Sequence, residues 1–369
     1  MSPWTRLLPL AVLAVGACGD APLPTQSLGG APASQFTDDG HLGVFAQNLY
    51  IGTDVDAVLT APADQVADRV VAALATFLAT DWNDRARAIA AEIVRNGADV
   101  VALNEVTTLA VAGFAPYFPD FTVVFLDVLM AEIAQAGGRY EVAGVVNNID
   151  LTLGLGGASI RLRDADALLV RRGVGVANLT AANYAARVTV PLGPLGSVDL
   201  VRGYVAADIT SRGRTARVVV THLEPKSTSP LLQLGQAQEL AAVLGGATLP
   251  VIIAGDINSD PSDPDPVTPY RLFAAAGFQD AGLLANAAGG NVPTCCNDAD
   301  LRNASQAFDE RIDHVLMRRA AGARPAAKAI APVRFTLFGD EPSERTAGGL
   351  WPSDHAGVFV QVGWQGLLH

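Results

Sequence analysis

The sequence is poor in cysteine and in positive charge. Its 369 residues include three cysteines, Cys18, Cys295 and Cys296, too few for a framework of disulfides across the fold. The adjacent pair can close a vicinal disulfide or remain as two thiols. Lys and Arg number 25 against 37 Asp and Glu, so the formal net charge is −12. Because no run of Lys or Arg could follow a phosphate backbone, tight nonspecific binding to nucleic acid is not expected.

Long apolar runs are also missing. The run from Leu7 to Val15 follows Arg6 and is too short to span a membrane, which is typical of a secretory signal. Val15-Gly16-Ala17-Cys18 resembles a bacterial lipobox, in which the cysteine is lipidated and becomes the first residue. We therefore expect a signal peptide at 1–17, a flexible tether at 18–39, and a protein anchored in the cell envelope through a lipid on Cys18. The alternative is an ordinary signal peptide and a secreted protein.

Apolar residues, by contrast, make up half of the chain, and 17% of the residues are charged. This composition excludes disorder and predicts a large buried core. The composition does not shift between residues 40 and 365, so we expect one domain at 40–369, and we expect it to be a monomer.

The most informative stretch is Val251 to Asn258. Four apolar residues predict a short buried strand, and Gly255 frees the backbone at its end. Asp256 and Asn258 are two residues apart, so on an extended segment their side chains point the same way. They would lie at a strand end, where open α/β sheets commonly place their chemistry. The alternative interpretation is an Asx-rich turn that merely closes the strand.

The same pattern, an apolar strand with a polar side chain at or next to its end, recurs along the chain. Carboxylate and amide oxygens of this kind suit Mg²⁺ or Ca²⁺, and a His beside an Asp suits proton transfer at neutral pH. The polar residues at these positions are Asn48, Glu105, His222, Asp256, Asn258, Asp313, Asp354 and His355.

Between the strands, helical periodicity is found at 63–79, 82–96, 231–244 and 270–276. The apolar stretch Phe121 to Ala136 is a further helix candidate. It could offer an apolar surface over the site for a lipidic or aromatic substrate, or it could simply pack on a sheet. The Gly-rich stretch Leu153 to Gly157 predicts a flexible loop.

Six short segments that occur in one order carry a family resemblance. The series resembles the endonuclease/exonuclease/phosphatase superfamily, which has the DNase I-like fold. Asn104 stands where the family commonly has Gln, Ile257 stands where it has Phe, and Asp166 aligns only loosely with an Asn. The matching segments are Gln47-Asn48, Leu103 to Val106, Thr221-His222-Leu223, Gly255 to Asn258, Arg311 to His314, and Ser353-Asp354-His355.

The resemblance implies a fold class of α/β (α+β) type: a four-layer α/β/β/α sandwich of two packed mixed β-sheets flanked by helices. It also implies roles for the site residues. Asn48 and Glu105 resemble the metal-binding pair, and Asp354 a further group that binds or positions metal. Mg²⁺ is the expected cation, with Mn²⁺ or Ca²⁺ as alternatives.

The remaining residues resemble the catalytic groups of the family. Asp256 and Asn258 are similar to the groups that orient the attacking water and contact the phosphoryl oxygens. His355 resembles the general base or phosphate-contacting imidazole, and Asp313 its orienting carboxylate. His222 is similar to the second histidine, which contacts the phosphate or the leaving oxygen.

We therefore expect a metal-dependent phosphoesterase whose substrate is a nucleic acid, a phospholipid headgroup or a small phosphoester. A noncatalytic cell-surface binding lipoprotein on the same fold is the alternative. A binding protein has no need of a complete set of acids, amides and histidines, which favours the enzyme. No Gly-x-Ser-x-Gly, His-Glu-x-x-His or Walker motif points to another class of hydrolase.

Overall fold

The computed structural model describes residues 40–59, 61–62, 64–191, 196–285, 291–320 and 329–365. The expected signal peptide, Cys18 and the tether lie outside the described residues, so these stay predictions. Within the ranges that are described, no helix is both long enough and apolar enough to cross a membrane.

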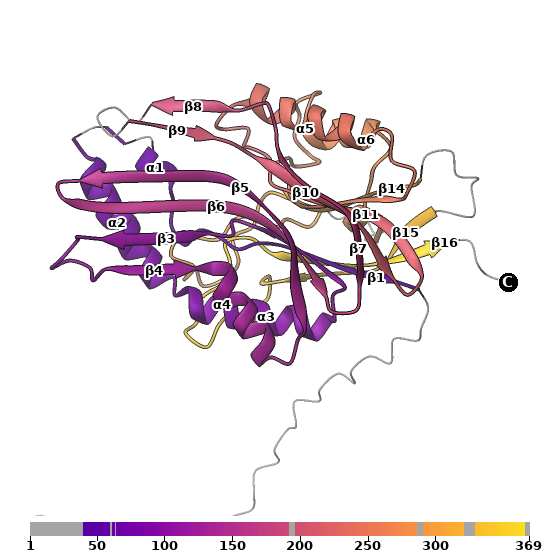
Figure 1. Ribbon diagram of the computed structural model, residues 1–369, viewed down its shortest axis with the longest axis horizontal. Helices are drawn as coiled ribbons and strands as arrows, with labels where there is room; N and C mark the ends of the chain where they lie inside the picture. Colours follow the sequence, from indigo (N-terminus) through magenta and orange to yellow (C-terminus); the bar gives the residue numbers. More distant parts are fainter. Residues whose placement is uncertain are drawn as a thin grey trace, which may run out of the picture. The chain divides into compact units, whose positions relative to one another are not determined.

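Two mixed β-sheets form the body of the domain (Figure 1). In the described part of the chain the larger sheet has eight strands, in the order β15-β16-β1-β2-β6-β3-β4, with β5 paired to β6. β1 and β2 are parallel, so their carboxyl ends lie at the same edge of the sheet. The strands are β1 (Leu42–Asn48), β2 (Val100–Asn104), β3 (Thr108–Ala112), β4 (Phe121–Val124), β5 (Tyr140–Leu155), β6 (Ala158–Arg171), β15 (Ala329–Phe338) and β16 (Gly357–Gln365).

The smaller sheet has the order β13-β14-β12-β11-β10-β7, again counting described residues alone. β11 and β12 are its parallel pair, and a separate hairpin of β8 and β9 packs against β5. The strands are β7 (Gly175–Asn183), β8 (Val188–Pro191), β9 (Ser197–Leu200), β10 (Gly203–Ser211), β11 (Arg214–Thr221), β12 (Val251–Asp256), β13 (Gln279–Asp280) and β14 (Asp313–Arg318).

Three of the helices begin at residues whose side chains cap them. The Asp81 side chain accepts a hydrogen bond from the backbone of Asp84 at the start of α3, and Gly97 ends that helix with φ +58°. Ser229 and Thr268 cap α5 and α6, each followed by a proline at the first helical position. The helices are α1 (Asp56–Leu59), α2 (Val66–Ala79), α3 (Trp82–Asn96), α4 (Phe125–Gln135), α5 (Pro230–Leu244), α6 (Pro269–Ala275), α7 (Ala281–Ala285) and a 3₁₀ turn, η2 (Pro342–Glu344).

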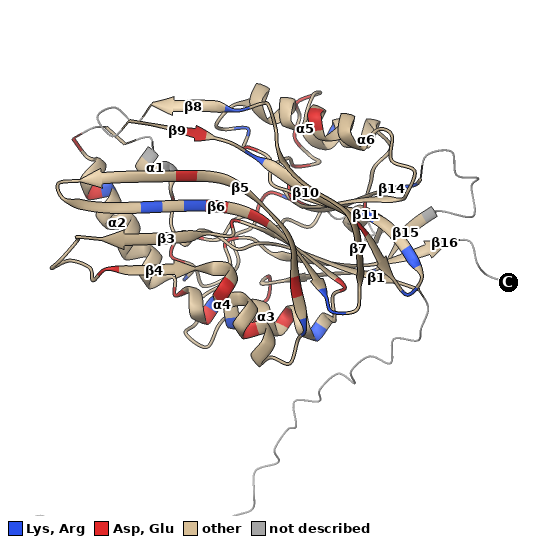
Figure 2. Ribbon diagram, in the orientation of Figure 1, with Lys and Arg blue, Asp and Glu red and all other residues tan. Residues whose placement is uncertain are grey.

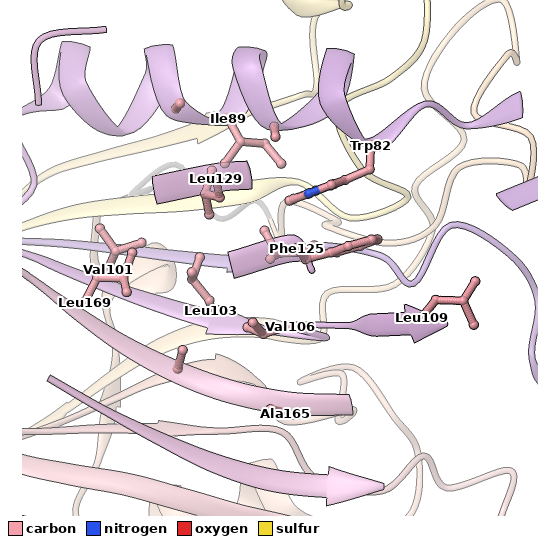
Figure 3. Packing of buried hydrophobic residues seen from close by; sticks show 14 of the residues in the cluster. Trp82, Ile89, Val101, Leu103, Val106, Leu109, Phe125, Leu129, Ala165 and Leu169 are labelled. Atoms are coloured by element: carbon pink, nitrogen blue, oxygen red, sulfur yellow. The ribbon is translucent and has the colours of Figure 1, made fainter. Parts of the chain in front are cut away.

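Three apolar cores separate the layers. Along β1, Val44 belongs to the core between the two sheets and the next residue, Phe45, to the core under α2, α3 and α4. In that outer core the rings of Trp82 and Phe125 stack with centroids 4.0 Å apart (Figure 3). α5 and α6 cover the outer face of the smaller sheet through residues such as Phe273. The four-layer α/β/β/α sandwich expected from the resemblance is therefore confirmed.

For residues 106–163 the structure decides between the two alternatives for 121–136 and corrects the loop expected at 153–157. α4 offers no apolar surface over the site, because Phe125, Leu129 and Ile133 are buried in the core against α3; the alternative, a helix packed on a sheet, is right. The stretch 153–157 is not a flexible loop. Leu153 to Leu155 belongs to β5, and only the two glycines turn into β6.

Acidic and basic residues are interspersed on the described surface. The charged residues of β5 are acidic, Glu141 and Asp150, and β6 carries arginines and aspartates, so these strands form no continuous basic stripe (Figure 2). The expectation that tight nonspecific binding to nucleic acid is absent stays a prediction.

Candidate active site

An open cleft of about 1090 Å³ lies where the strand ends of both sheets meet. Its lining includes six of the eight site residues predicted from the sequence: Glu105, His222, Asp256, Asn258, Asp354 and His355. The other two, Asn48 and Asp313, are buried directly behind them and hydrogen-bond to residues of this set. The structure thus brings all eight together.

Asn48 and Glu105 meet because β1 and β2 are parallel and end side by side. The amide Nδ2 of Asn48 donates to Glu105 Oε1 at 3.0 Å and to Asp256 Oδ2 at 3.2 Å, while its Oδ1 accepts from the backbone N of Tyr50 at 2.9 Å. The backbone N of Ile51 donates to Glu105 Oε2 at 2.7 Å. Asn48 therefore positions two carboxylates with its nitrogen, and its oxygen is engaged by the backbone.

Asp256 is held at the junction of the two sheets. Asn104, on the larger sheet, accepts from the backbone N of Asp256 at 2.9 Å and donates to the backbone oxygen of Thr221 at 3.1 Å. Gly255 has φ +137°, and a Cβ there would collide with the Thr221 oxygen and the Asn104 side chain. The departure from the family pattern at Asn104 thus has a structural role that sequence reasoning missed.

Two site residues have left-handed backbone conformations. Glu105 has φ +54° and Asn258 has φ +50°, values that cost a non-glycine residue on the order of 1–3 kcal/mol. The Asn258 backbone N donates to Asp256 Oδ1 at 2.8 Å, and its Nδ2 donates to the backbone oxygen of Leu223 at 2.9 Å. These contacts hold the Asn258 side chain at the cleft, as those from Asn48 and Ile51 hold Glu105, and such outliers concentrate at functional sites.

His355 and Asp313 form a buried pair. His355 Nδ1 lies 2.8 Å from Asp313 Oδ2 and 3.9 Å from Asp256 Oδ2. Asp313 and Asp256 are direct cross-strand neighbours on β14 and β12. Burial alone would lower the pKa of His355, but the carboxylates of Asp313 and Asp354 raise it well above the ordinary value. His355 is therefore an imidazolium at neutral pH.

His222 has the opposite electrostatic setting. Burial, followed by the charge of Arg202, holds its pKa well below the ordinary value, so it is neutral. Arg202 Nη1 lies 3.0 Å from His222 Nδ1, and a guanidinium can only donate, so Nδ1 is the acceptor. The proton of the neutral ring then sits on Nε2, which lies 3.4 Å from Asp256 Oδ2. Arg202 thus fixes the tautomer that presents an N–H to the cleft.

Arg202 belongs to a buried polar cluster that sequence reasoning did not identify. Its Nε donates to Glu224 Oε2 at 2.9 Å, and its Nη1 lies 3.8 Å from Asp164 Oδ2. Asn148 donates to both Asp164 and Asp166, at 3.2 and 3.1 Å. Burial raises the pKa of Asp164 to about 8 and that of Asp166 to about 7. The sequence did hold one signal of this cluster: Asp164 and Asp166 are two residues apart on β6, and residues at that spacing on a strand share a face.

Cys295 and Cys296 line the same cleft. Cys295 Sγ lies 3.6 Å from His355 Nε2, on the side of the ring opposite Asp313. The two adjacent sulfur atoms, whether a disulfide or two thiols, thus lie beside the candidate catalytic imidazole.

The cleft suits a hard divalent cation. Glu105, Asp256 and Asp354 are oxygen donors in one cavity, and such donors are preferred by Mg²⁺, Mn²⁺ and Ca²⁺. Burial, together with neighbouring carboxylates, raises the pKa of Asp256 and Asp354, and a cation would offset this concentration of negative charge. The carboxylates Asp256 and Asp313 also lie within ligand distance of each other and of His355. The donor set therefore fits the cation that the resemblance implies.

Comparisons with known proteins agree with this site. The sequence profile described as the Endonuclease/Exonuclease/phosphatase family matches residues 76–355. A comparison with curated proteins found no match.

Three solved structures share the fold at low sequence identity. One is an endonuclease/exonuclease/phosphatase family protein from Leptotrichia buccalis, with TM-score 0.51 and 14% identity, covering 87% of this chain and 99% of that chain. A mannosyl-6-phosphatase from Bacteroides thetaiotaomicron has TM-score 0.50 and 15% identity, with the same coverage. Humanized D. rerio TDP2 carrying 14 mutations has TM-score 0.50 and 17% identity, covering 88% of this chain and 99% of that chain. Because the profile match extends over most of the sequence, the chain belongs to the endonuclease/exonuclease/phosphatase family.

Proposed function

We propose that the chain hydrolyses a phosphodiester bound in the cleft, with a divalent cation held by Glu105 and Asp354. Membership of its family makes it a metal-dependent phosphoester hydrolase in general terms. One observation carries the finer proposal. Asp256 Oδ2 lies 3.2 Å from Asn48 Nδ2, 3.4 Å from His222 Nε2 and 3.9 Å from His355 Nδ1. A single carboxylate thus faces the metal-binding side and both imidazoles.

The charge states of these groups suit an in-line displacement. The raised pKa of Asp256 makes its carboxylate a better proton acceptor, so it can orient a water and take its proton. The His355 imidazolium can donate to a phosphoryl oxygen, and neutral His222 can donate through Nε2 to the leaving oxygen. When bound, the cation would neutralise charge that develops on the phosphoryl group.

The Asn258 amide nitrogen and His222 Nε2 lie 3.2 Å apart, and because both carry protons in the tautomer set by Arg202, they can donate together to one phosphoryl oxygen. Asp313 orients His355 and favours its charged form. Asn48 holds Glu105 and Asp256 in place through Nδ2.

A substrate panel tests this proposal. The full chain would be assayed on supercoiled DNA, RNA, sphingomyelin, inositol phosphates and bis-p-nitrophenyl phosphate, each with added Mg²⁺, Mn²⁺ or Ca²⁺ and each with EDTA. We expect multiple turnovers on at least one phosphodiester, lost in EDTA and lost in His355→Ala. Binding of a phosphoester without turnover under every condition would instead support the noncatalytic alternative.

We also propose that the mature protein is anchored in the cell envelope through a lipid on Cys18. This rests on the sequence of residues 15–18 and on the short apolar run before it. A secreted protein with an ordinary signal peptide remains the alternative.

A further inference from the structure

A second, apolar pocket lies next to the cleft, between α2 and the ends of β3, β5 and β6 that lie at the left in Figure 1. Among the described residues that line it, Thr53 alone has a polar side-chain group. Its walls include Val58, Ala73, Phe77 and Leu153. Ligand pockets are mostly apolar with a few polar groups placed to fix orientation, so this pocket and the polar cleft together have the composition of one binding site.

The loop after Tyr50 connects the two cavities. Ile51, Thr53 and Val55 line both the cleft and the pocket, and so does Leu162 on β6. The backbone N of Ile51 donates to Glu105 Oε2 at 2.7 Å, while the Ile51 side chain lines the pocket. Ile51, which donates to the candidate metal ligand Glu105, therefore also forms part of the pocket wall.

The apolar wall also continues into the cleft itself. Ile149 and Leu200 line the cleft, and they belong to the small core in which β9 packs on β5. Leu153 lies in the same core and also lines the pocket, so the β8–β9 hairpin supports both. Most residues of the pocket wall are buried, so an apolar group that entered the pocket from the cleft would be removed from water.

We propose that this pocket binds the hydrocarbon part of the substrate, so that the enzyme prefers phosphoesters carrying an aliphatic chain. The inference rests on the proposed function, because it takes the phosphate to lie at Glu105 and Asp256. A nucleobase is a poor occupant, since its polar edges would be left without hydrogen-bond partners among these side chains. An alkyl chain has no hydrogen bonds to lose in the pocket, and its transfer from water to an apolar site is favourable.

The test uses p-nitrophenyl phosphodiesters whose second ester group is methyl, butyl or hexyl, assayed with the full chain and metal. We expect kcat/KM to rise with chain length, by up to about fourfold for each buried methylene. Ala73→Leu places extra atoms inside the pocket and should flatten this dependence. Ala75→Leu is the matched control, because Ala75 is exposed on the same helix and should keep the wild-type dependence.

Equal rates for the methyl and hexyl esters, or an undiminished chain-length dependence in Ala73→Leu, would overturn the subsite. Absence of hydrolysis of all three esters would count against the proposed function instead. The pocket is then tested by calorimetry of methylphosphonate and hexylphosphonate on the wild-type chain, which needs no turnover and no variant. Tighter binding of the hexyl compound supports the pocket, and equal binding overturns it.

Discussion

Arg202 donates to Nδ1 of His222 across 3.0 Å, and through this contact a residue directly before β10 determines which nitrogen of the imidazole faces the substrate. The same guanidinium is paired with Glu224 at 2.9 Å, so its position is held from the other side. An arginine is the appropriate partner because it stays charged and cannot accept a hydrogen bond.

The first prediction follows from this contact. Arg202→Met should lower kcat/KM by about 10–100-fold, the usual effect of removing the partner that orients a functional imidazole. It should also raise the pKa of His222, because a nearby positive charge is lost. The measurement is the pH dependence of kcat/KM, in which the limb set by His222 moves to higher pH, with partial recovery in Arg202→Lys. Arg161→Met, at an exposed ion pair with Asp150, is the control. An unchanged pH profile in both Arg202 variants would contradict the assignment.

The second prediction concerns His355 and Asp313. His355→Ala should lower kcat by about 10²–10⁴-fold, the range for a general acid or base, with little change in metal affinity. Asp313→Asn should cause a milder loss. The Asp313 charge raises the pKa of His355, so its removal should shift the alkaline limb of the profile to lower pH. The measurements are phosphodiester hydrolysis against pH and metal titrations. Wild-type rates in His355→Ala would rule out a catalytic role.

The third prediction separates metal binding from proton transfer. Glu105→Gln should weaken the binding of the cation, because one negative oxygen donor becomes neutral. Its activity should recover in part at high metal concentration, which His355→Ala should not do. The measurement is activity against Mg²⁺ concentration after removal of metal with EDTA. Glu141→Gln, at an exposed ion pair with Arg172, is the matched control. Full activity of the parent enzyme in EDTA would be incompatible with a metal centre.

The fourth prediction concerns stability against pH. Burial alone would raise the pKa of Asp280, but His314, 2.9 Å away, and Arg311 lower it to about 2. Because the folded-state value lies below the unfolded value of about 3.9, this carboxylate stabilises the fold above about pH 4, and the contribution is lost as the pH falls toward 2. Its size is about 2 kcal/mol.

Asp280→Asn should therefore lower the free energy of unfolding by about 2 kcal/mol or more at pH 7 and flatten its decline in acid. The measurement is urea unfolding at pH 7, 5 and 3. Asp150→Asn, at the surface, is the control and should have little effect. Equal stability of Asp280→Asn and the parent protein at pH 7 would contradict the ion-pair argument.

The fifth prediction concerns anchoring. If Cys18 carries the lipid, Cys18→Ser should block removal of residues 1–17 and move the protein out of the membrane fraction. A single acyl chain binds membranes only marginally, whereas several chains on one cysteine hold firmly. The measurements are the mass of the mature protein and its fractionation. Unchanged processing and fractionation of Cys18→Ser would favour the secreted alternative.

The sequence led to the site residues because each lies at or next to the end of an apolar run. A run of four to seven apolar residues predicts a buried strand from local composition alone. The parallel pairs β1–β2 and β11–β12 then place their carboxyl ends at common edges, which is how Asn48 comes to contact Glu105. The roles of these residues remain predictions, and only their convergence is a structural fact.

The sequence did not predict the long β5–β6 hairpin, because the glycines at 154, 156 and 157 indicate a loop. Leu151 and Leu153 alternate with polar or small residues, which is the period of a half-buried strand. Gly154 favours a loop by local composition, although a strand can hold a glycine when its neighbours pack on another element. Here β9 supplies that element, through Val198 and Leu200.

Local pattern thus determined the strands that end in site residues and the helices α2, α3, α5 and α6, because burial and periodicity are encoded within a few residues. Tertiary structure decided the contacts between distant segments: the Asn104 bridge between the sheets, the Arg202–His222 pair and the apolar pocket beside Glu105. These depend on which faces of two sheets meet and on what a loop such as 51–55 covers. The energies of such long-range contacts depend on three-dimensional packing, and no periodic pattern in the sequence indicates them.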